Sequence, residues 1–289
     1  MKILFLLALF MLNLFADKIL ILNSDASIEK YKSVQEEFIK NTKTPYELLD
    51  IAKLSKKEIK EYLYDEYPDI VYTIGLKAHR YANMYIPEKT IFFSSIINHK
   101  RINMDENRYG VSNELHSGMH LTIIKSLFHE TQTLSLIYSD YTKDLFENFK
   151  SNALNLGINI IGEKITNDNS IDIQNIQQSD GLILIADPLL LKDEQKVIKL
   201  FEDMHQVKKP IFAYDNLYIK LGASLVISAD NPTIGRQVAY MMQLFNDKKD
   251  FAKIQIPMGT NVIFNKKRVE GLEVNYNKQA LSVVNEVIE

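Results

Sequence analysis

Pro68-Asp-Ile-Val-Tyr-Thr-Ile-Gly75 is a short apolar run that stops at a glycine, and a helical pattern follows it at Lys77–Met84. Five further apolar runs also end at small or polar residues: Lys18–Leu22, Thr90–Phe93, Leu134–Tyr138, Gly181–Ile185 and Pro210–Tyr214. Strands that are apolar on both faces and alternate with helices are typical of parallel sheets covered by helices on both sides. The sequence therefore predicts an α/β fold.

The alternation of strands and helices starts again near residue 114. Ser179-Asp-Gly-Leu-Ile-Leu184 occupies in the second half the place that residues 68–73 occupy in the first. A chain of 289 residues is long enough for two domains, yet no Gly/Ser/Pro-rich linker divides it. We therefore expect two domains, with the chain crossing between them as strands more than once.

Local capping signals predict where several helices begin and end. Ser27 is the expected N-cap of a helix through about Lys40. Ser55 and Glu58 have the spacing of a capping box at the start of the next helix. Further along, the pattern predicts one continuous helix over Leu191–Gln206 and a final helix over Gln279–Val287.

The N-terminus has the features of a secretory signal peptide. Met1-Lys2 is basic, residues 3–15 carry no charge, and Ala16 is a small residue before the charged Asp17. The segment is too short to span a bilayer, which takes roughly 20 apolar residues. We expect cleavage near Ala16 and export to the periplasm, the alternatives being a buried first strand or an N-terminal anchor.

Composition excludes several classes of function. The net charge of −3 becomes −4 without Lys2, which argues against a nucleic-acid partner. The absence of cysteine excludes thiolate metal sites, cysteine nucleophiles and a lipid-modified cysteine. No Gly-x-Gly or Gly-x-Ser-x-Gly motif occurs, so dinucleotide binding and esterase chemistry are not indicated. We expect no enzyme activity and no cofactor.

Three histidines are candidate functional groups. His116 and His120 are four residues apart on a predicted helix, a spacing that can present two imidazoles to a metal, but no third ligand is evident. The alternative is an exposed helix start, and we expect no metal site. His99 lies near a strand end and is interpreted either as a ligand contact or as a solvated loop residue.

Candidate ligand-binding residues are the small, aromatic or acidic residues at the ends of the predicted strands. In open α/β sheets, ligands bind beyond the carboxyl ends of the strands. Serine hydroxyls can bind a carboxylate, and glycine lets the backbone approach a ligand at a helix start. The candidates are Ser24, Gly75, Ser94 and Ser95 in the first half, and Tyr138, Asp187 and Asp215 in the second.

Two of these candidates have open alternatives. Asp187 follows an apolar strand and precedes Pro188, so it either pairs with a ligand ammonium group or caps the turn at Leu189–Leu191. Gly75 either approaches the ligand or serves a simple turn.

Several short motifs follow one another along the chain in a specific order. They are Asp69-Ile-Val-Tyr-Thr-Ile-Gly75, Thr90-Ile-Phe-Phe-Ser-Ser95, Tyr109-Gly-Val-Ser112, Leu134-Ser-Leu-Ile-Tyr138, Lys209-Pro-Ile-Phe-Ala-Tyr-Asp215, Leu221-Gly-Ala-Ser224, Ile234-Gly-Arg-Gln-Val-Ala239 and Asn265-Lys-Lys267. Together they resemble the periplasmic substrate-binding proteins of ABC transporters, specifically the family with tryptophan/tyrosine-type binding proteins. The resemblance covers most of the chain after residue 16.

This resemblance implies a type I periplasmic binding fold. Such proteins have two Rossmann-like lobes with parallel sheets flanked by helices, joined by three crossovers, and they close over a ligand by hinge motion. Lobe one is expected to take 17–113 plus 230–256, and lobe two 114–229 plus 257–289. The usual Asp-Pro after the fourth strand is replaced by Ile96-Ile-Asn98, and the loop after the first strand is short, so the family's ligand does not carry over directly.

The expected function follows from this resemblance and from the strand ends together. We expect an exported solute-binding protein that captures a small, amino acid-like and possibly aromatic molecule in an interlobe cleft for an ABC permease. The alternative is a monomeric periplasmic sensor subunit that reports ligand occupancy to a membrane receptor. In both cases the protein is expected to be a monomer. A third alternative, an enzyme of the same sandwich class, is disfavoured because no nucleophile–base pair is evident in the sequence.

Overall fold

The computed structural model describes residues 18–102, 105–167 and 171–289, so the predicted leader 1–16 and its cleavage site lie outside the described residues. Two compact units form: residues up to Glu114 with Asp230–Gly259 (unit 1), and Leu115–Ala229 with Thr260–Glu289 (unit 2). The chain therefore passes three times between the units. Within the described ranges, no helix combines the length and apolar character of a membrane span.

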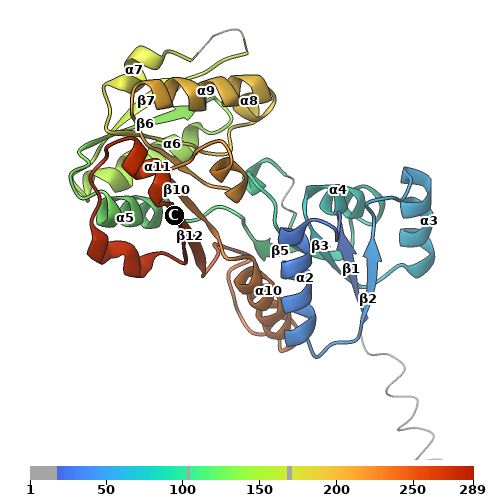
Figure 1. Cartoon of the computed structure of the whole chain (residues 1–289). Helices are drawn as coiled ribbons and strands as arrows, with labels where there is room; N and C mark the ends of the chain where they lie inside the picture. The colour runs from blue at the N-terminus through green and yellow to red at the C-terminus, as the bar shows by residue number, and fades with distance from the viewer. Residues whose placement is uncertain (1–17, 103–104, 168–170) are drawn as a thin grey trace, which may run out of the picture. The chain divides into compact units, whose positions relative to one another are not determined.

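Unit 1 is built on a six-stranded parallel sheet in the order β11-β5-β4-β3-β1-β2 (Figure 1). Its strands are β1 (Ile19–Asn23), β2 (Tyr46–Asp50), β3 (Ile70–Ile74), β4 (Thr90–Ser94), β5 (Arg108–Val111) and β11 (Ile254–Gln255). All five residues of β1 and of β3 are buried, as expected for strands covered on both faces.

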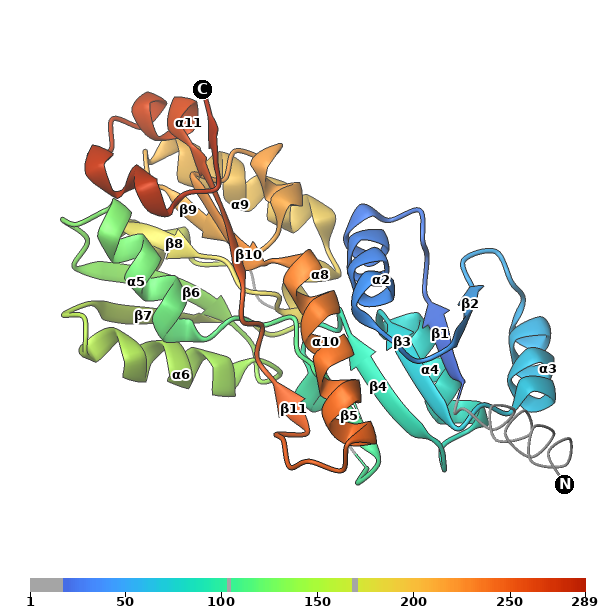
Figure 2. The same ribbon diagram turned by 90° about the horizontal axis from the view of Figure 1, so that it is seen from below.

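Helices cover both faces of this sheet. They are α2 (Glu29–Asn41), α3 (Lys56–Glu66), α4 (Leu76–Tyr85) and α10 (Asn231–Asn246), with a short 3₁₀ turn η2 (His99–Arg101) after β4. Leu22 and Val71 pack in one core cluster with Ile59 of α3 and Ala82 of α4. Helices α2 and α10 lie side by side, which Figure 2 shows, although they are far apart in the sequence.

The starts of α2 and α3 test two capping predictions. The box at α3 is confirmed: Ser55 accepts from the Glu58 amide, and the Glu58 side chain accepts from the Ser55 amide. The prediction for Ser27 is wrong. Helix α2 starts at Glu29 with Ile28 at its N-cap, and the Ser27 hydroxyl instead donates to Asp25 Oδ1 at 2.5 Å. Ser27 instead belongs to the turn before the helix, where the Asp25 carboxylate also accepts from the Ser27 amide at 2.9 Å.

Unit 2 is built on a seven-stranded sheet in the order β13-β12-β10-β9-β8-β6-β7. Its strands are β6 (Thr133–Tyr138), β7 (Asn159–Lys164), β8 (Gly181–Ile183), β9 (Ile211–Ala213), β10 (Leu225–Ala229), β12 (Thr260–Asn265) and β13 (Glu286–Ile288). Only β12 runs antiparallel to its neighbour β10, and β13 then pairs parallel to β12.

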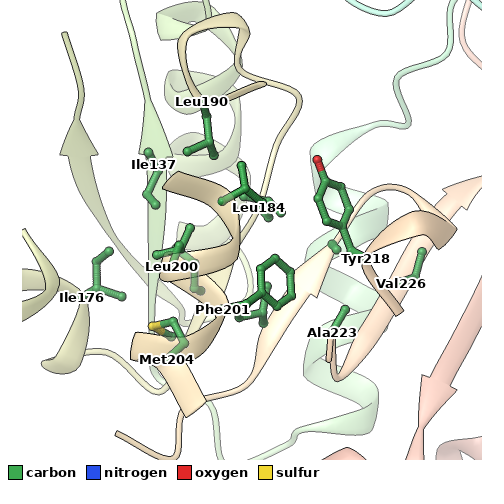
Figure 3. Close-up of a cluster of buried hydrophobic side chains, with 14 of the residues drawn as sticks. Ile137, Ile176, Leu184, Leu190, Leu200, Phe201, Met204, Tyr218, Ala223 and Val226 are labelled. Carbon is green, nitrogen blue, oxygen red and sulfur yellow. The ribbon is translucent and has the colours of Figure 1, made fainter. Parts of the chain in front are cut away.

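The helical elements of unit 2 are α5 (Ser117–Leu127), α6 (Lys143–Leu154), α7 (Ile173–Gln177), α8 (Pro188–Leu191), α9 (Glu194–Gln206), η3 (Asn216–Ile219), α11 (Lys266–Gly271) and η4 (Lys278–Val283). Of these, α7, α8, α9 and η3 contribute side chains to the buried cluster that Figure 3 shows. Leu200, Phe201 and Met204 on one face of α9 pack against Ile137 and Leu184. The other face of the sheet carries Phe128, whose ring lies 5.0 Å from that of Phe212.

Two predicted helices of unit 2 are wrong in detail. The expected helix over 191–206 is broken at Lys192-Asp193, because the Asp193 side chain accepts from the Lys196 amide and starts α9 afresh. The expected final helix over 279–287 is a 3₁₀ turn followed by β13. Strand β12 offers an open edge, and pairing with it outweighs the weak helical preference of these last residues.

Candidate functional site

Three predicted ligand residues of unit 1 lie at one edge of its sheet. Asn23 of β1 is in register with Ile74 of β3, and Ile74 is in register with Ser94 of β4. Backbone hydrogen bonds continue this register one residue further, from the Ser24 amide to the Ile74 carbonyl and from the Gly75 amide to the Ser94 carbonyl, each at 3.0 Å. The structure therefore brings Ser24, Gly75 and Ser95 together at the carboxyl ends of three adjacent strands.

Gly75 connects β3 to α4 in a conformation that only glycine adopts readily. Its φ is +85°, and a Cβ atom here would lie 2.7 Å from Ser24 Oγ and 2.9 Å from the Tyr31 ring. Ser24 Oγ accepts from the Ala78 amide in the first turn of α4 at 2.9 Å. Within the described chain, the two preceding amides of α4, at Leu76 and Lys77, donate to no internal acceptor. This helix start is therefore equipped to receive an anion.

Ser95 adds an unsatisfied hydroxyl to the same edge. The residue is 7% exposed and takes a left-handed backbone (φ 58°) directly after β4. Its Oγ is one of four buried side-chain polar atoms without a hydrogen-bond partner among the described residues. The other three atoms lie elsewhere: on Ser135 in the middle of β6, on Ser224 directly before β10, and on Arg268 of α11. A buried hydroxyl without a hydrogen-bond partner is costly and calls for an explanation.

Ser94 does not share this role. Its side chain is fully buried, and its hydroxyl shares a 2.7 Å hydrogen bond with the Tyr72 hydroxyl inside unit 1. Burial raises the pKa of Tyr72 well above its usual range, so the phenol stays neutral. The ligand-contact prediction for the Ser94 side chain is therefore replaced by a packing role within the sheet.

Asp187 has the capping role that was one of its two interpretations. The residue has no exposed surface, and one carboxylate oxygen accepts from Leu189 and Leu190 amides at 2.8 and 3.4 Å, at the start of α8. The other oxygen accepts from the amide and hydroxyl of Ser139 and from the Thr142 hydroxyl. Five internal donors surround this carboxylate, so the predicted bond to a ligand ammonium group is not retained.

The remaining candidates in unit 2 are partly exposed. Tyr138 ends β6, and its ring stacks on Phe146 of α6 with centroids 4.2 Å apart, a contact that Gly162 permits by lacking a Cβ. Asp215 follows β9 and accepts from the Leu217 amide at 3.0 Å. Nearby, Tyr214 and Tyr218 join their hydroxyls at 3.0 Å. For Tyr138 and Asp215 a role in binding stays a prediction.

Two exposed leucines at this edge of unit 2 are not among the candidate residues predicted from the sequence. Leu191 at the end of α8 is 44% exposed, and Leu217 on η3 is 71% exposed. Tyr141, after β6, is 50% exposed. Because β8 lies between β6 and β9 in the sheet, these three side chains follow adjacent strands. Leucines in a helical pattern resemble core residues, so only their exposure distinguishes them.

The three candidate histidines make contacts within the protein. His116 caps α5 by accepting from the Gly118 amide at 3.1 Å, and the half-buried His120 lies edge-on to Phe149. His99 Nδ1 lies 2.7 Å from a Glu114 oxygen. Among the residues the structure describes, no group of three or more His, Cys, Asp or Glu side chains could hold a metal ion.

Comparison with known proteins connects this architecture to one family. The family model described as ABC transporter substrate binding protein matches residues 22–288. No curated protein sequence matches the chain significantly.

Solved structures share the fold at low sequence identity. A ligand-free, open substrate-binding protein with adhesive properties from Clostridium difficile has a TM-score of 0.71 at 13% identity and covers 94% of this chain and 99% of its own. An ABC domain from Streptococcus pneumonia in complex with L-Trp has a TM-score of 0.61 at 15% identity, covering 93% and 100%. A conserved domain protein from Vibrio cholerae has a TM-score of 0.60 at 16% identity, covering 94% and 99%. The predicted fold, with two mostly parallel sheets flanked by helices, is confirmed.

Proposed function

Because the chain belongs to the ABC transporter substrate-binding protein family, we propose that it is an exported protein that captures a small carboxylate-bearing molecule and delivers it to an ABC permease. Members of this family bind a small molecule and act with a permease rather than as enzymes. The carboxylate requirement comes from the strand ends of unit 1.

The single observation that carries this proposal is the buried Ser95 hydroxyl, which has no hydrogen-bond partner in the described part of the chain. Ser95 directly follows β4. The carbonyl of Ser94, the last residue of β4, accepts from the amide of Gly75, which is the N-cap of α4, so Ser95 lies beside the start of α4. A carboxylate bound there would receive the Ser95 hydroxyl together with amides of the first turn of α4. Charge-assisted hydrogen bonds of this kind are roughly twice as strong as neutral ones.

Unit 2 carries large, exposed apolar or aromatic side chains at the carboxyl edge of its own sheet, namely Tyr141, Leu191 and Leu217. Side chains of this kind suit the apolar part of a small ligand. Amino acids, aromatic ones above all, are the first compounds to test, because a structural neighbour is described in complex with L-Trp.

The test compares two buried serines whose hydroxyls both lack a hydrogen-bond partner among the described residues. Ser95→Ala removes the hydroxyl at the carboxyl edge, whereas Ser135→Ala removes an equally buried, unpartnered hydroxyl in the middle of β6. A thermal-shift screen of amino acids and organic acids identifies ligands, since saturation at 100 times Kd adds about 2.7 kcal/mol of stability. Titration calorimetry then measures affinity.

We expect Ser95→Ala to weaken binding about tenfold, which corresponds to about 1.4 kcal/mol for one hydrogen bond to a charged group. Ser135→Ala should leave the affinity unchanged. Equal affinities for Ser95→Ala and the parent protein would contradict the carboxylate site. Reconstitution with a candidate permease, with ligand uptake as the readout, tests delivery.

A further inference from the structure

The half-buried guanidinium of Arg268, on α11 of unit 2, has no partner within the described part of the chain. Its Nε is buried without a hydrogen bond, and no ion pair holds the group among the described residues. Burial lowers the pKa of Arg268, so the charge has lost part of its hydration. By contrast, Arg108 donates to four acceptors, and Arg236 pairs with Glu37 at 2.9 Å. A partly desolvated charge without a counter-charge is costly and needs an explanation.

Gly222 holds the Arg268 guanidinium in place. This glycine lies between η3 and β10 and has a φ of +97°, a conformation that favours glycine. A Cβ at Gly222 would lie 3.1 Å from Arg268 Cζ and 3.3 Å from both Nε and Nη2, so the guanidinium packs directly against the backbone here. Nε and Nη2 form the fork through which arginine binds carboxylates and phosphates with two parallel hydrogen bonds.

The connection before β10 contains a second polar atom without a partner. Ser224 is fully buried, and its Oγ has no hydrogen-bond partner among the described residues. The Ser224 carbonyl accepts from the Asn265 amide, and the Asn265 side chain accepts from the Arg268 amide, both at 3.0 Å. These bonds join residues 222–224 to the start of α11. Two of the four partnerless buried atoms of the described chain therefore lie in these two neighbouring segments.

Two lysines add positive charge to the same segments. Lys220 comes shortly before Gly222, and Lys267 directly precedes Arg268. Both lysines are exposed, and their ammonium groups have no partner among the residues that the structure describes. Strand β12 runs antiparallel to β10, so its end and α11 lie where β10 begins, at the edge of the sheet opposite to the carboxyl ends of the parallel strands. Three cations without a counter-charge favour an anion that carries more than one negative charge.

We propose that Arg268, together with Lys220 and Lys267, forms a binding site for a phosphate group on unit 2. A phosphate accepts both hydrogen bonds of the guanidinium fork, and a phosphomonoester carries about −1.5 to −2 charges at neutral pH. The group belongs either to a free phosphate compound or to the headgroup of an anionic phospholipid. The site is independent of the carboxylate site at Ser95, which belongs to unit 1.

The experiment titrates the full chain with inorganic phosphate and with glycerol 3-phosphate in a calorimeter, at constant ionic strength and with chloride as the reference salt. Arg268→Gln removes the guanidinium, and Arg268→Lys keeps the charge but loses the fork. Arg80→Gln is the matched control, because Arg80 is an exposed arginine on α4 of unit 1 and its loss changes the net charge equally. Sedimentation with phosphatidylglycerol vesicles, against phosphatidylcholine vesicles, tests the lipid source.

We expect the parent protein to bind a soluble phosphate or the phosphatidylglycerol vesicles, and Arg268→Gln to weaken this binding about tenfold. Arg268→Lys should weaken it as well, and Arg80→Gln should leave it unchanged. Without phosphate, Arg268→Gln should be at least as stable as the parent in urea, because it removes an unpaired, partly buried charge.

The two arms of the experiment separate the sources of the phosphate group. Binding of the soluble phosphates identifies a free compound, and binding of the phosphatidylglycerol vesicles alone identifies a lipid. If neither binds, or if Arg268→Gln and Arg80→Gln weaken binding equally, the proposed site is overturned.

Discussion

Ser139 donates both its amide and its hydroxyl to one oxygen of Asp187, at 2.8 and 2.7 Å, although the two residues are 48 positions apart. The contact joins the loop after β6 to the loop after β8. Leu189 binds the other oxygen of the same carboxylate, so Asp187 holds two loops and the start of α8 in one arrangement. Removing the Asp187 carboxylate should therefore lower the stability of the protein more directly than its affinity for a ligand.

Asp187→Asn should lower the free energy of unfolding by about 3 kcal/mol, because the new amide places an NH₂ group against donors that lose their acceptor. Urea denaturation measures this change. Asp193→Asn is the matched control, since Asp193 is an exposed N-cap with one amide bond, and asparagine caps equally well. Equal destabilisation by the two variants would contradict the role described for Asp187.

His79 is fully buried in a chain of hydrogen bonds that requires a neutral ring. Arg108 Nε donates to Asn83 Oδ1 at 2.7 Å, so the Asn83 amide nitrogen faces His79 Nε2, also at 2.7 Å. His79 Nδ1 then donates to Thr73 Oγ1, which donates to the Phe92 carbonyl. Burial, with the nearby Arg108 charge, lowers the pKa of His79 to about 4.

This arrangement predicts a loss of stability in mild acid. The unfolded imidazole takes up a proton near its ordinary pKa of about 6.5, while the folded one resists down to about 4, so acid favours the unfolded chain between these values. His79 alone should cost about 2 kcal/mol between pH 7.5 and pH 5. Urea titrations across this range should give a shallower pH dependence for His79→Gln than for the parent. An unchanged slope would contradict the prediction.

Helices α2 and α10 touch through a glycine. A Cβ on Gly235 would lie 2.3 Å from the Val34 carbonyl oxygen and 3.0 Å from the Phe38 amide nitrogen. Gly235→Ala should therefore separate the helices and destabilise unit 1 by about 2 kcal/mol, despite the better helix propensity of alanine. Thermal unfolding of both variants and of the parent protein measures this change. Gly271→Ala is the control: its added Cβ meets no described atom within 4 Å, so it should be neutral or stabilising.

Gly75→Ala tests the geometry of the proposed anion site. With φ at +85° and Ser24 Oγ 2.7 Å from the added Cβ, the substitution must shift the link between β3 and α4. We expect a loss of about 1–2 kcal/mol in stability together with weaker binding of carboxylates. Gly157→Ala is a useful comparison, because its φ of +64° imposes similar backbone strain with open space around the new methyl group. If both variants bind equally well, Gly75 has only a turn role.

The strands were predictable because their signals are local. Buried runs such as Ile70–Ile74 and the capping box at Ser55 need only neighbouring residues to be recognised. Strand β13 could not be recognised in this way, because its partner β12 decides its conformation. The end of β4 was predictable, but the different roles of its two serines were not. Ser94 forms a hydrogen bond with Tyr72, whereas the backbone of Ser95 turns into the left-handed region, and neither fact has a signal in the sequence.

Asp187 illustrates the limit of the site prediction. The sequence shows an aspartate before a proline at a strand end, which suits a cap and a ligand contact alike. The donors that decide between them, on Ser139 and Thr142, lie 48 and 45 positions earlier and reach Asp187 only through the pairing of β6 with β8. Long-range pairing of this kind has no local signature.

The ion pair of Arg236 with Glu37, at 2.9 Å, connects residues 199 positions apart within unit 1. Because α10 and β11 belong to this unit but follow residues 115–229 of unit 2 in the chain, a ribosome must synthesise most of the protein before the first sheet can receive its last helix and strand. Until these residues are made, the face of α2 that packs against α10 lacks its partner, so unit 1 can complete its core only late in synthesis.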